Sequence, residues 1–290
     1  MRDPIARSGP RVSIIVPSFN RARYLGDAID SVRAQTVDDW ECIIVDDGST
    51  DGADRVARKL ASSDARVSVH CQHNRGPSAA RNVALARARG AWVQFLDADD
   101  LLDPTKLERQ LNAVEGSGVC VAQCDYRDRF DDPSVDPSRE WHVSPRLSPG
   151  RELVDLVVRW ATDIAPPIHS FLVRRERLAR EKILFNESLR AFEDWDFWVR
   201  LFSTDPGLAW VPEVLVTYRR HSENATRQLW PMVRGFHAAI RVQREHWRDD
   251  PLIRRLIGHR ELFLPMWVLT SGVACVAPTF AARAQRWRRG

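Results

Sequence analysis

The sequence predicts an α/β fold in which a mostly parallel, Rossmann-like sheet is flanked by helices. Short apolar runs rich in β-branched residues, such as 12–16 and 42–45, are typical of buried parallel strands. Segments with helical spacing separate these runs, and polar residues follow three of them directly. Strands that alternate with helices form parallel sheets with right-handed crossovers, and the ligand site lies outside the carboxyl ends of the strands.

The first half of the chain contributes four strands and three helices to this prediction. The expected strands cover 12–16, 42–45, 67–70 and 91–96, and the expected helices cover 22–34, 51–62 and 77–89. Pro17 is expected to end the first strand, because proline cannot donate to a strand ladder. A further helix is expected over 104–114, since Asp103 suits the N-cap and Pro104 the first helical position.

The second half is less regular. Beyond an expected strand at 119–123, residues 125–148 are rich in Asp, Pro, Ser and Arg and are predicted to form a mobile loop. The remaining expected elements are helices at 153–160 and 192–202, an extended segment at 168–173, a last strand at 211–218, and helical stretches at 233–248 and 252–260. After these comes 262–282, which contains no charged residue.

A cluster of three carboxylates follows the fourth expected strand. Asp97, Asp99 and Asp100 stand within four residues, and carboxylates this close raise each other's pKa unless a cation or several donors neutralise them. Hard oxygen ligands beside a phosphate-bearing substrate favour Mg²⁺ or Mn²⁺ over zinc. The alternative is a solvated acidic turn that caps the following helix.

Three other motifs carry groups suited to a nucleotide. Phe19, after the first strand, can stack on a nucleobase or can be a buried turn residue. Asp47, after the second strand, can accept a hydrogen bond from a base imide or ribose hydroxyl, and Gly48 permits close backbone approach; the alternative here is a helix cap. Arg81 follows a helix N-terminus expected at the same edge, and both favour a phosphate.

Together, the four motifs resemble the family 2 glycosyltransferases, inverting enzymes of the GT-A fold that use nucleotide-sugar donors. The resemblance covers roughly 11–218, with the motifs in family order. It implies that the donor is bound by the matching residues, Pro17, Phe19, Asn20, Arg21, Asp47, Arg81, Asp97, Ala98 and Asp99. The acidic cluster matches the family's DxD region, which implies that Asp99 and Asp100 face the ribose and a Mn²⁺ or Mg²⁺ ion. Phe19 replaces the more usual Tyr and lacks its hydroxyl.

The family also places a catalytic base in a Glu-Asp pair that opens a later helix, and Asp194 fits that position. A carboxylate at a helix N-terminus between Phe192 and Trp195 is partly desolvated, which raises its pKa, while the helix end and a nearby metal hold it ionised. The alternative is that Glu193, Asp194 and Asp196 only form the polar face of an amphipathic helix. We expect this of Asp196.

Basic residues follow the last expected strand. His221 resembles a family position that meets the diphosphate or the metal, and we assign it as a metal ligand beside the acidic cluster. Arg219 and Arg220 are weaker candidates, because arginine is common throughout this chain. His169 can line an acceptor pocket, but simple packing is the preferred interpretation.

The tail is the basic part of the chain. Residues 231–290 hold eleven arginines and four acidic residues. The uncharged run at 262–282 has the length of a membrane span, but its Pro, Gly, Ser and Thr residues favour a packed helix or a membrane-surface segment. Nucleic-acid binding is not expected, because the arginines are interleaved with acidic residues and form no known reading motif.

We divide the chain into a disordered leader (1–10), a GT-A glycosyltransferase domain (11–229) and a basic helical C-terminal extension (230–290). The domain consists of a nucleotide-binding half (11–124) and an acceptor half (125–229). Five cysteines without CxxC spacing, and a leader without an apolar run, predict a cytoplasmic protein. Peripheral contact with the inner face of the membrane, through the extension, is the alternative left open.

The sequence therefore predicts a metal-dependent inverting glycosyltransferase with Asp194 as general base. It would move a sugar from a nucleotide-diphosphate donor, such as a UDP-sugar, to a hydroxyl of a saccharide, lipid-linked or small-molecule acceptor. A nucleotidyltransferase is one alternative, although Pro-Ser-Phe-Asn stands where a Gly-rich, Lys-bearing phosphate loop is expected. A non-catalytic nucleotide-sugar-binding protein is the other.

Overall fold

The computed structural model describes residues 9–131, 141–160, 164–224, 226 and 228–258. Its strands are β1 (Val12–Ser18), β2 (Trp40–Asp46), β3 (Val67–Cys71), β4 (Trp92–Phe95), β5 (Leu101–Leu102), β6 (Val121–Phe130), β7 (Trp141–Val143), β8 (Phe171–Arg174) and β9 (Leu208–Arg220). Its helices are α1 (Ala22–Arg33), α2 (Ala53–Ser63), α3 (Pro77–Leu85), α4 (Lys106–Val114), α5 (Glu152–Arg159), the 3₁₀ turn η1 (Ile168–Ser170), α6 (Arg175–Arg180), α7 (Glu193–Phe202) and α8 (Leu229–His246). A further helical stretch covers 251–258. Most of the expected leader and all of 262–282 lie outside the described residues.

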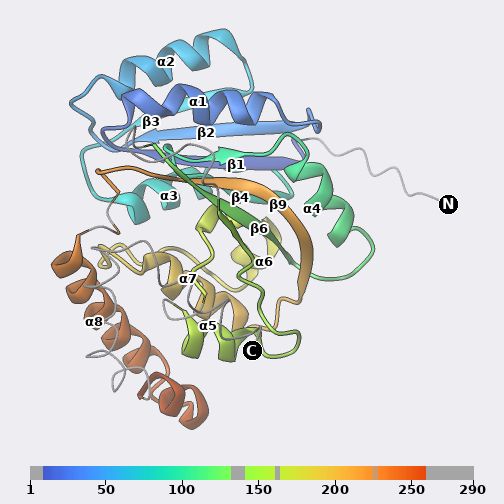
Figure 1. Ribbon diagram of the computed structural model, residues 1–290, viewed down its shortest axis with the longest axis vertical. Helices are drawn as coiled ribbons and strands as arrows, with labels where there is room; N and C mark the ends of the chain where they lie inside the picture. The colour runs from blue at the N-terminus through green and yellow to red at the C-terminus, as the bar shows by residue number, and fades with distance from the viewer. Residues whose placement is uncertain (1–8, 132–140, 161–163, 225, 227, 259–290) are drawn as a thin grey trace.

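A nine-stranded sheet runs in the order β3-β2-β1-β4-β8-β6-β9-β5, with β7 paired to β6 (Figure 1). β3, β2, β1 and β4 are parallel to one another. β8 lies antiparallel to both β4 and β6, while β6 and β9 are parallel. The predicted α/β fold with a mostly parallel sheet is confirmed, and the antiparallel β8 joins the two halves of that sheet.

Helices cover both faces of the sheet. Successive residues of a strand point to opposite faces, so Ile14 packs in a core with α1 and α4, whereas Ile15 packs in a core with α3, α5, α7 and α8. The second core contains Trp195 and Trp198, whose side chains are fully buried. Burying a large apolar side chain contributes about 1.5–3 kcal/mol, so these residues fix α7 firmly against the sheet.

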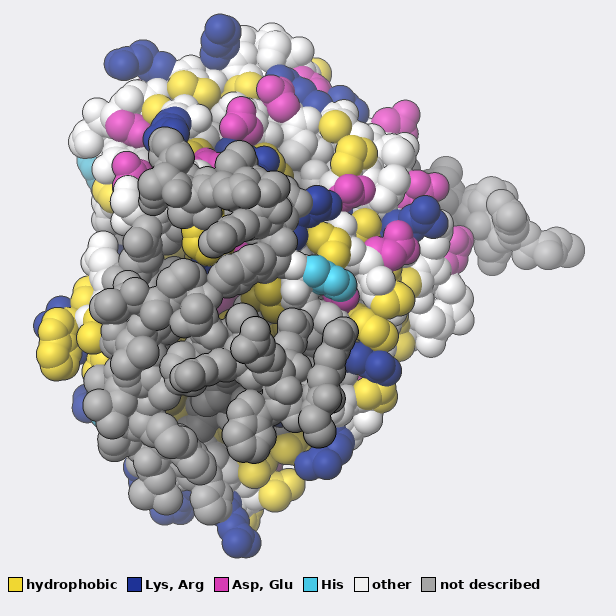
Figure 2. Space-filling model, viewed as in Figure 1, with side chains coloured by type: hydrophobic (Ala, Val, Ile, Leu, Met, Phe, Trp, Pro, Cys, Tyr) yellow, Lys and Arg dark blue, Asp and Glu magenta, His cyan; other side chains and the backbone are white. Residues whose placement is uncertain are grey.

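α8 packs directly against the start of α7. A Cβ atom at Gly235 would lie 2.6 Å from the Ala191 methyl carbon, so only glycine allows this approach. The rings of Phe236 and Phe192 meet edge to face, with centroids 5.3 Å apart. Lys and Arg side chains lie along the lower left edge of Figure 2, where α8 runs in Figure 1. The division of the chain at 229/230 stays a prediction.

Among the described helices, none combines the length and the apolar character that a membrane crossing requires. The uncharged run at 262–282 lies outside the described residues, so the expectations for it stay predictions.

Several predicted boundaries in the first half are wrong, among them the end of the third helix, which stops at Leu85 instead of residue 89. β1 continues through Pro17 to Ser18, because β4 pairs with β1 only as far as Ile15 and the missing proline N–H therefore costs no ladder bond on that side. The helix after the acidic cluster begins at Lys106, two residues late. The carboxylate of Asp103 accepts hydrogen bonds from the N–H and hydroxyl of Thr105 in the turn before it.

The predicted loop at 125–148 is also wrong in part. β6 extends to Phe130 because β9 pairs with it along its whole length, across a register shift near Asp125. β7 then pairs with the same strand. The polar residues of this segment are typical of a loop. Those up to Phe130 form a strand because β9, about ninety residues further along the chain, pairs with them.

Candidate active site

A cleft of about 710 Å³ opens at the carboxyl ends of β1, β2 and β4. Most of the predicted site residues line it, namely Pro17, Phe19, Arg21, Asp47, Arg81, Asp97, Ala98, Asp99 and Asp194. Asn20, Asp100 and His221 do not line it. Residues predicted from three separate strand ends and two helices are therefore gathered around one space.

Asp47 organises the end of the cleft formed by β1 and β2. Its side chain is buried and accepts hydrogen bonds from the Gln72 amide (2.7 Å) and the Arg75 N–H (2.9 Å) at Oδ1, and from the Gly76 N–H (2.7 Å) at Oδ2. Each carboxylate oxygen has two lone pairs, so Oδ2 retains one for a ligand N–H. Phe19 is 44% exposed nearby in the cleft wall and presents a ring for stacking.

Asn20 joins the turns after β1 and β2. Its backbone, at a left-handed φ of 52°, donates to Ser49 Oγ at 2.9 Å, and its side-chain oxygen accepts from the Thr50 N–H at 2.8 Å. Gly48 has a φ of 79°, and a Cβ there would lie 3.0 Å from the Asn74 nitrogen. Asn20 and Gly48 do not line the cleft themselves, but they fix the backbone of the turns that carry its lining residues.

Arg81 connects the acidic cluster to α7. Its buried guanidinium donates to Asp97 at 2.8 Å and to Glu193 at 2.9 Å. Burial by itself would lower the pKa of Arg81, but the two carboxylates raise it above the usual arginine value. The cation is therefore already balanced on both sides, and it fixes Asp97 relative to the first turn of α7.

Asp99 faces two nitrogen groups. Its Oδ2 accepts from Arg21 Nε at 2.8 Å and lies 3.1 Å from His221 Nε2. Burial opposes ionisation, but the hydrogen bonds from His221 and Arg21 hold the pKa of Asp99 below its usual value. His221 is stacked on Tyr24, with ring centroids 4.5 Å apart. A carboxylate oxygen and a fixed imidazole nitrogen at this spacing can hold a divalent cation.

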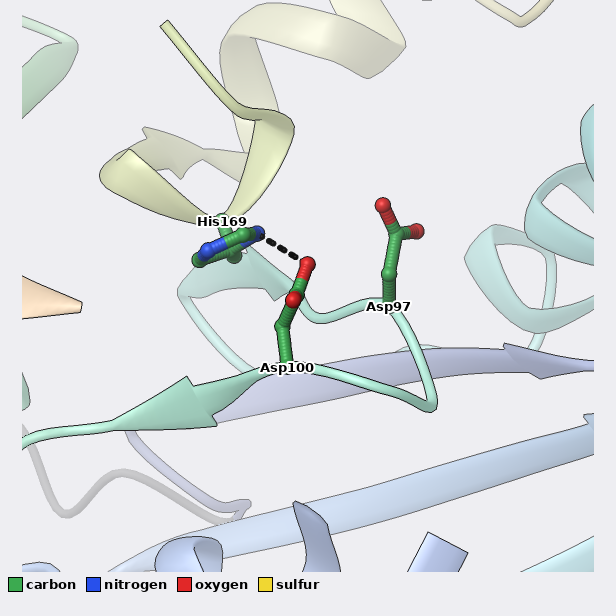
Figure 3. Close-up of side chains that lie close together, drawn as sticks. All are labelled: Asp97, Asp100 and His169. Carbon is green, nitrogen blue, oxygen red and sulfur yellow. Dashed lines mark ion pairs between the residues drawn. The ribbon is translucent and has the colours of Figure 1, made fainter. Parts of the chain in front are cut away.

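Asp100 points toward His169 instead (Figure 3). Their Oδ2 and Nδ1 atoms are 3.3 Å apart, and both side chains are buried. Neither ring nitrogen of His169 has a hydrogen-bond partner among the described residues. Burial lowers the pKa of His169 to about 4, and burial with the neighbouring Asp99 and Asp97 raises that of Asp100 well above its usual value. Asp97, Asp100 and His169 each place one ligand atom within 4.8 Å of the others, so they form a second grouping suited to a metal.

The two arginines at the end of β9 lie in different places. Arg219 is buried, donates to Asp27 at 2.8 Å, and gives its backbone N–H to Asp100 at 2.7 Å. It ties the acidic cluster to α1 and β9 and does not line the cleft. Arg220 lines the cleft and is paired with Asp128 at 2.9 Å.

Asp194 stands in the first turn of α7 and faces the cleft. Its Oδ1 accepts the Trp195 N–H at 2.7 Å, and no described cation lies within ion-pair distance. Burial and the adjacent Glu193 raise the pKa of Asp194 to about 7.

Asp196 is buried on another side of the helix, where it is bound by Arg200 at 2.5 Å, so it has no place in the cleft.

Sequence reasoning missed several cleft residues, one on β6 and others near α5, α7 and α8. Tyr126, Trp160, Arg190 and Met232 all line the cleft. Tyr126 falls in the segment predicted as a loop, where only the continued apolar alternation of β6 could have revealed it. The other three depend on how helices pack across the cleft, for which the sequence holds no local signal.

The model of the family described as "Glycosyl transferase family 2" matches residues 13–179. The chain belongs to this family. The family interpretation of the sequence is thereby confirmed. Among curated relatives, the uncharacterized glycosyltransferase EpsJ of Bacillus subtilis is 31% identical over 223 residues, which cover 75% of this chain and 63% of EpsJ. The putative teichuronic acid biosynthesis glycosyltransferase TuaG of the same organism is 46% identical over 103 residues, or 35% of this chain and 41% of TuaG.

Two solved structures of similar fold support the predicted GT-A type architecture of this family 2 member. S. aureus TarS 1-349 in complex with UDP-GlcNAc is 18% identical, with a TM-score of 0.61 over 79% of this chain and 65% of that one. The mannosyltransferase PcManGT from Pyrobaculum calidifontis, in complex with GDP-Man and Mn²⁺, is 22% identical, with a TM-score of 0.61 over 97% of this chain and 78% of that one. The GT-A type fold is confirmed.

Proposed function

We propose that the protein transfers a sugar from a nucleoside-diphosphate donor to an acceptor hydroxyl, with inversion and with Asp194 as the general base. The observation that carries this proposal is the position of Asp194. It faces the same cleft as Asp47 and Asp99, and it is the cleft carboxylate whose pKa is raised to about 7. Family membership and the nucleotide-sugar complexes of TarS and PcManGT support a donor of this class.

The donor's nucleoside fits the end of the cleft formed by β1 and β2. Phe19 can stack on the base, and the remaining lone pair of Asp47 Oδ2 can accept a ring N–H. Such an N–H is present in uracil and in guanine, so UDP-sugars and GDP-sugars are both suitable probes. The diphosphate would then extend toward Asp99 and Arg21.

A divalent cation, Mn²⁺ or Mg²⁺, would stabilise the charge that develops on the departing diphosphate. Two groupings fit it by chemistry: Asp99 with His221, and Asp97 with Asp100 and His169. We propose the first, because only one of its two members, His221, lies outside the cleft lining, whereas Asp100 and His169 of the second both do. A cation that a ligand phosphate shares must lie near the cleft. Asp100 is buried away from it and accepts the Arg219 N–H, so we assign it to fixing β9.

Asp194 acts on the acceptor in this proposal. Its ionised form takes the proton from the acceptor hydroxyl as the oxygen attacks the anomeric carbon and the bond to the diphosphate breaks. The Trp195 N–H holds one carboxylate oxygen in place and leaves the other for the hydroxyl. Arg81 keeps Glu193 engaged, which fixes the helix turn that carries the base.

Product analysis tests the proposal. The purified protein is mixed with Mn²⁺, UDP-sugars or GDP-sugars, and a panel of saccharide and lipid-linked acceptors. Acceptor-dependent release of nucleoside diphosphate is expected. Release of pyrophosphate from a sugar phosphate and a nucleoside triphosphate would assign a nucleotidyltransferase instead. A raised melting temperature with a donor but no product from any pair would favour the non-catalytic binding protein, since a ligand that binds only the folded state stabilises it.

A further inference from the structure

One side of α8 carries a stripe of one aromatic and four basic residues. Trp230, Arg234, His237, Arg241 and Arg244 follow one another at intervals of three or four residues, which places them on one side of the helix, and all are exposed. We call these five residues the α8 stripe. The other side of the helix is buried in the core and consists of Val233, Gly235, Phe236, Ala239, Ile240 and Gln243.

The far end of the stripe borders a basic hollow. Stripe residues line it together with side chains of the following segment, and the full set is His237, Arg241, Val242, Arg244, Glu245, His246, Arg248 and Arg254. Glu245 is the only acidic member among them, and it pairs with Arg248 at 3.2 Å. Four arginines against one glutamate give this hollow a clear excess of positive charge, which attracts anionic groups.

The near end of the stripe borders the active-site cleft. Met232, in the first turn of α8, lines the cleft, and Trp230 is 66% exposed two residues before it. Tryptophan is enriched at membrane–water interfaces, where its ring enters the headgroup region, and arginines near such a surface attract anionic lipids. Figure 2 shows dark blue side chains along this edge, with hydrophobic ones at its upper end.

We propose that the α8 stripe binds an anionic lipid surface and holds the mouth of the cleft at the lipid headgroups. Lasting attachment to a membrane takes two signals, such as a basic patch and an apolar segment. Among the described residues, the exposed ring of Trp230 supplies an apolar contact beside the basic part of the stripe. An acceptor anchored in the bilayer would then reach the cleft without leaving the surface.

Vesicle sedimentation with the full chain tests this proposal. Vesicles of phosphatidylcholine alone are compared with vesicles that also contain phosphatidylglycerol. Arg234→Gln with Arg241→Gln should weaken binding to the anionic vesicles roughly 30-fold, because each basic residue near an anionic surface contributes about fivefold. Trp230→Ala should weaken binding further. The matched control is Arg55→Gln with Arg58→Gln, which removes two exposed arginines of α2 at the opposite end of the molecule (Figure 1).

Several results would overturn the proposal. One is equal binding to both kinds of vesicle, and another is equal weakening by the α2 control. A third is binding of duplex DNA that depends on Arg234 and Arg241 while vesicles stay unbound, which would assign the stripe to a nucleic acid. Vesicle binding is measured without sugar transfer, so its outcome is independent of the proposed reaction. Far-UV circular dichroism and donor binding in solution should be unchanged in both double variants, because neither pair lines the cleft.

Discussion

The two walls of the cleft differ in how their charges are balanced. On the wall formed by the ends of β1, β2 and β4, Asp47 accepts three hydrogen bonds and Asp99 is held by Arg21 and His221, while Arg81 of α3 pairs Asp97 of this wall with Glu193 of α7. On the wall formed by α7, Asp194 has a single N–H donor and a pKa raised to about 7. The first wall is organised in advance to hold a ligand, whereas the second keeps a carboxylate able to take a proton.

The largest expected effect comes from removing the base. Asp194→Asn should lower the transfer rate by about 10²–10⁴-fold, the usual contribution of a general base, while donor affinity stays nearly unchanged. Steady-state rates and calorimetric donor binding measure the two quantities separately. Asp54→Asn, a carboxylate in the first turn of α2, serves as the control and should retain the full rate. Near-normal transfer by Asp194→Asn would assign the base elsewhere.

The next largest effect is expected from removing Arg81, whose guanidinium connects the two walls. Arg81→Met removes the shared partner of Asp97 and Glu193 and should lower the free energy of unfolding by about 3 kcal/mol, the lower end for a broken buried pair because Asp97 is 31% exposed. Urea unfolding measures this change. Arg75→Met removes a pair with Glu187 in which both partners are exposed, and it should cost under about 1 kcal/mol. Equal losses in the two variants would contradict the role given to Arg81.

A smaller effect distinguishes the two metal groupings. His221→Asn should weaken the affinity for Mn²⁺ by about 10–100-fold, as loss of a metal ligand or its support does. His169→Asn should leave this affinity within a few-fold. Titration of Mn²⁺ against donor-dependent activity measures both constants. The reverse ranking of the two variants would place the cation at Asp97, Asp100 and His169.

The two walls also differ in how far the sequence predicts them. Strand ends of a parallel sheet meet at one edge, so local motifs such as the acidic cluster indicate a shared site before any packing is known. Asp194 could be placed because it opens an amphipathic helix with a recognisable family pattern. Met232 could not, since its position depends on the fit of Gly235 against Ala191, a contact between distant parts of the chain.

The position of His169 could not be predicted from the sequence for the same reason. Its place beside Asp100 depends on the packing of η1 behind the cleft, where the Gln94 side chain donates to the His169 carbonyl at 2.9 Å. A lone histidine in an extended segment carries no sign of that arrangement. Asp99 and Asp100 are adjacent in sequence, yet they face different histidines, because neighbouring side chains in a turn point in different directions.

The central claim is that Asp194 is the general base, because no cation among the described residues forms an ion pair with its carboxylate. The pH dependence of the transfer rate tests this claim most directly. Because burial and Glu193 raise its pKa to about 7, the ionised form grows as pH rises, and kcat should increase through about pH 7 and then level off. In Glu193→Gln the like charge is lost, so the same rise should occur at lower pH even if the maximal rate falls. A rise that stays at the same pH in both proteins, or one that is absent from the wild type, would contradict the account.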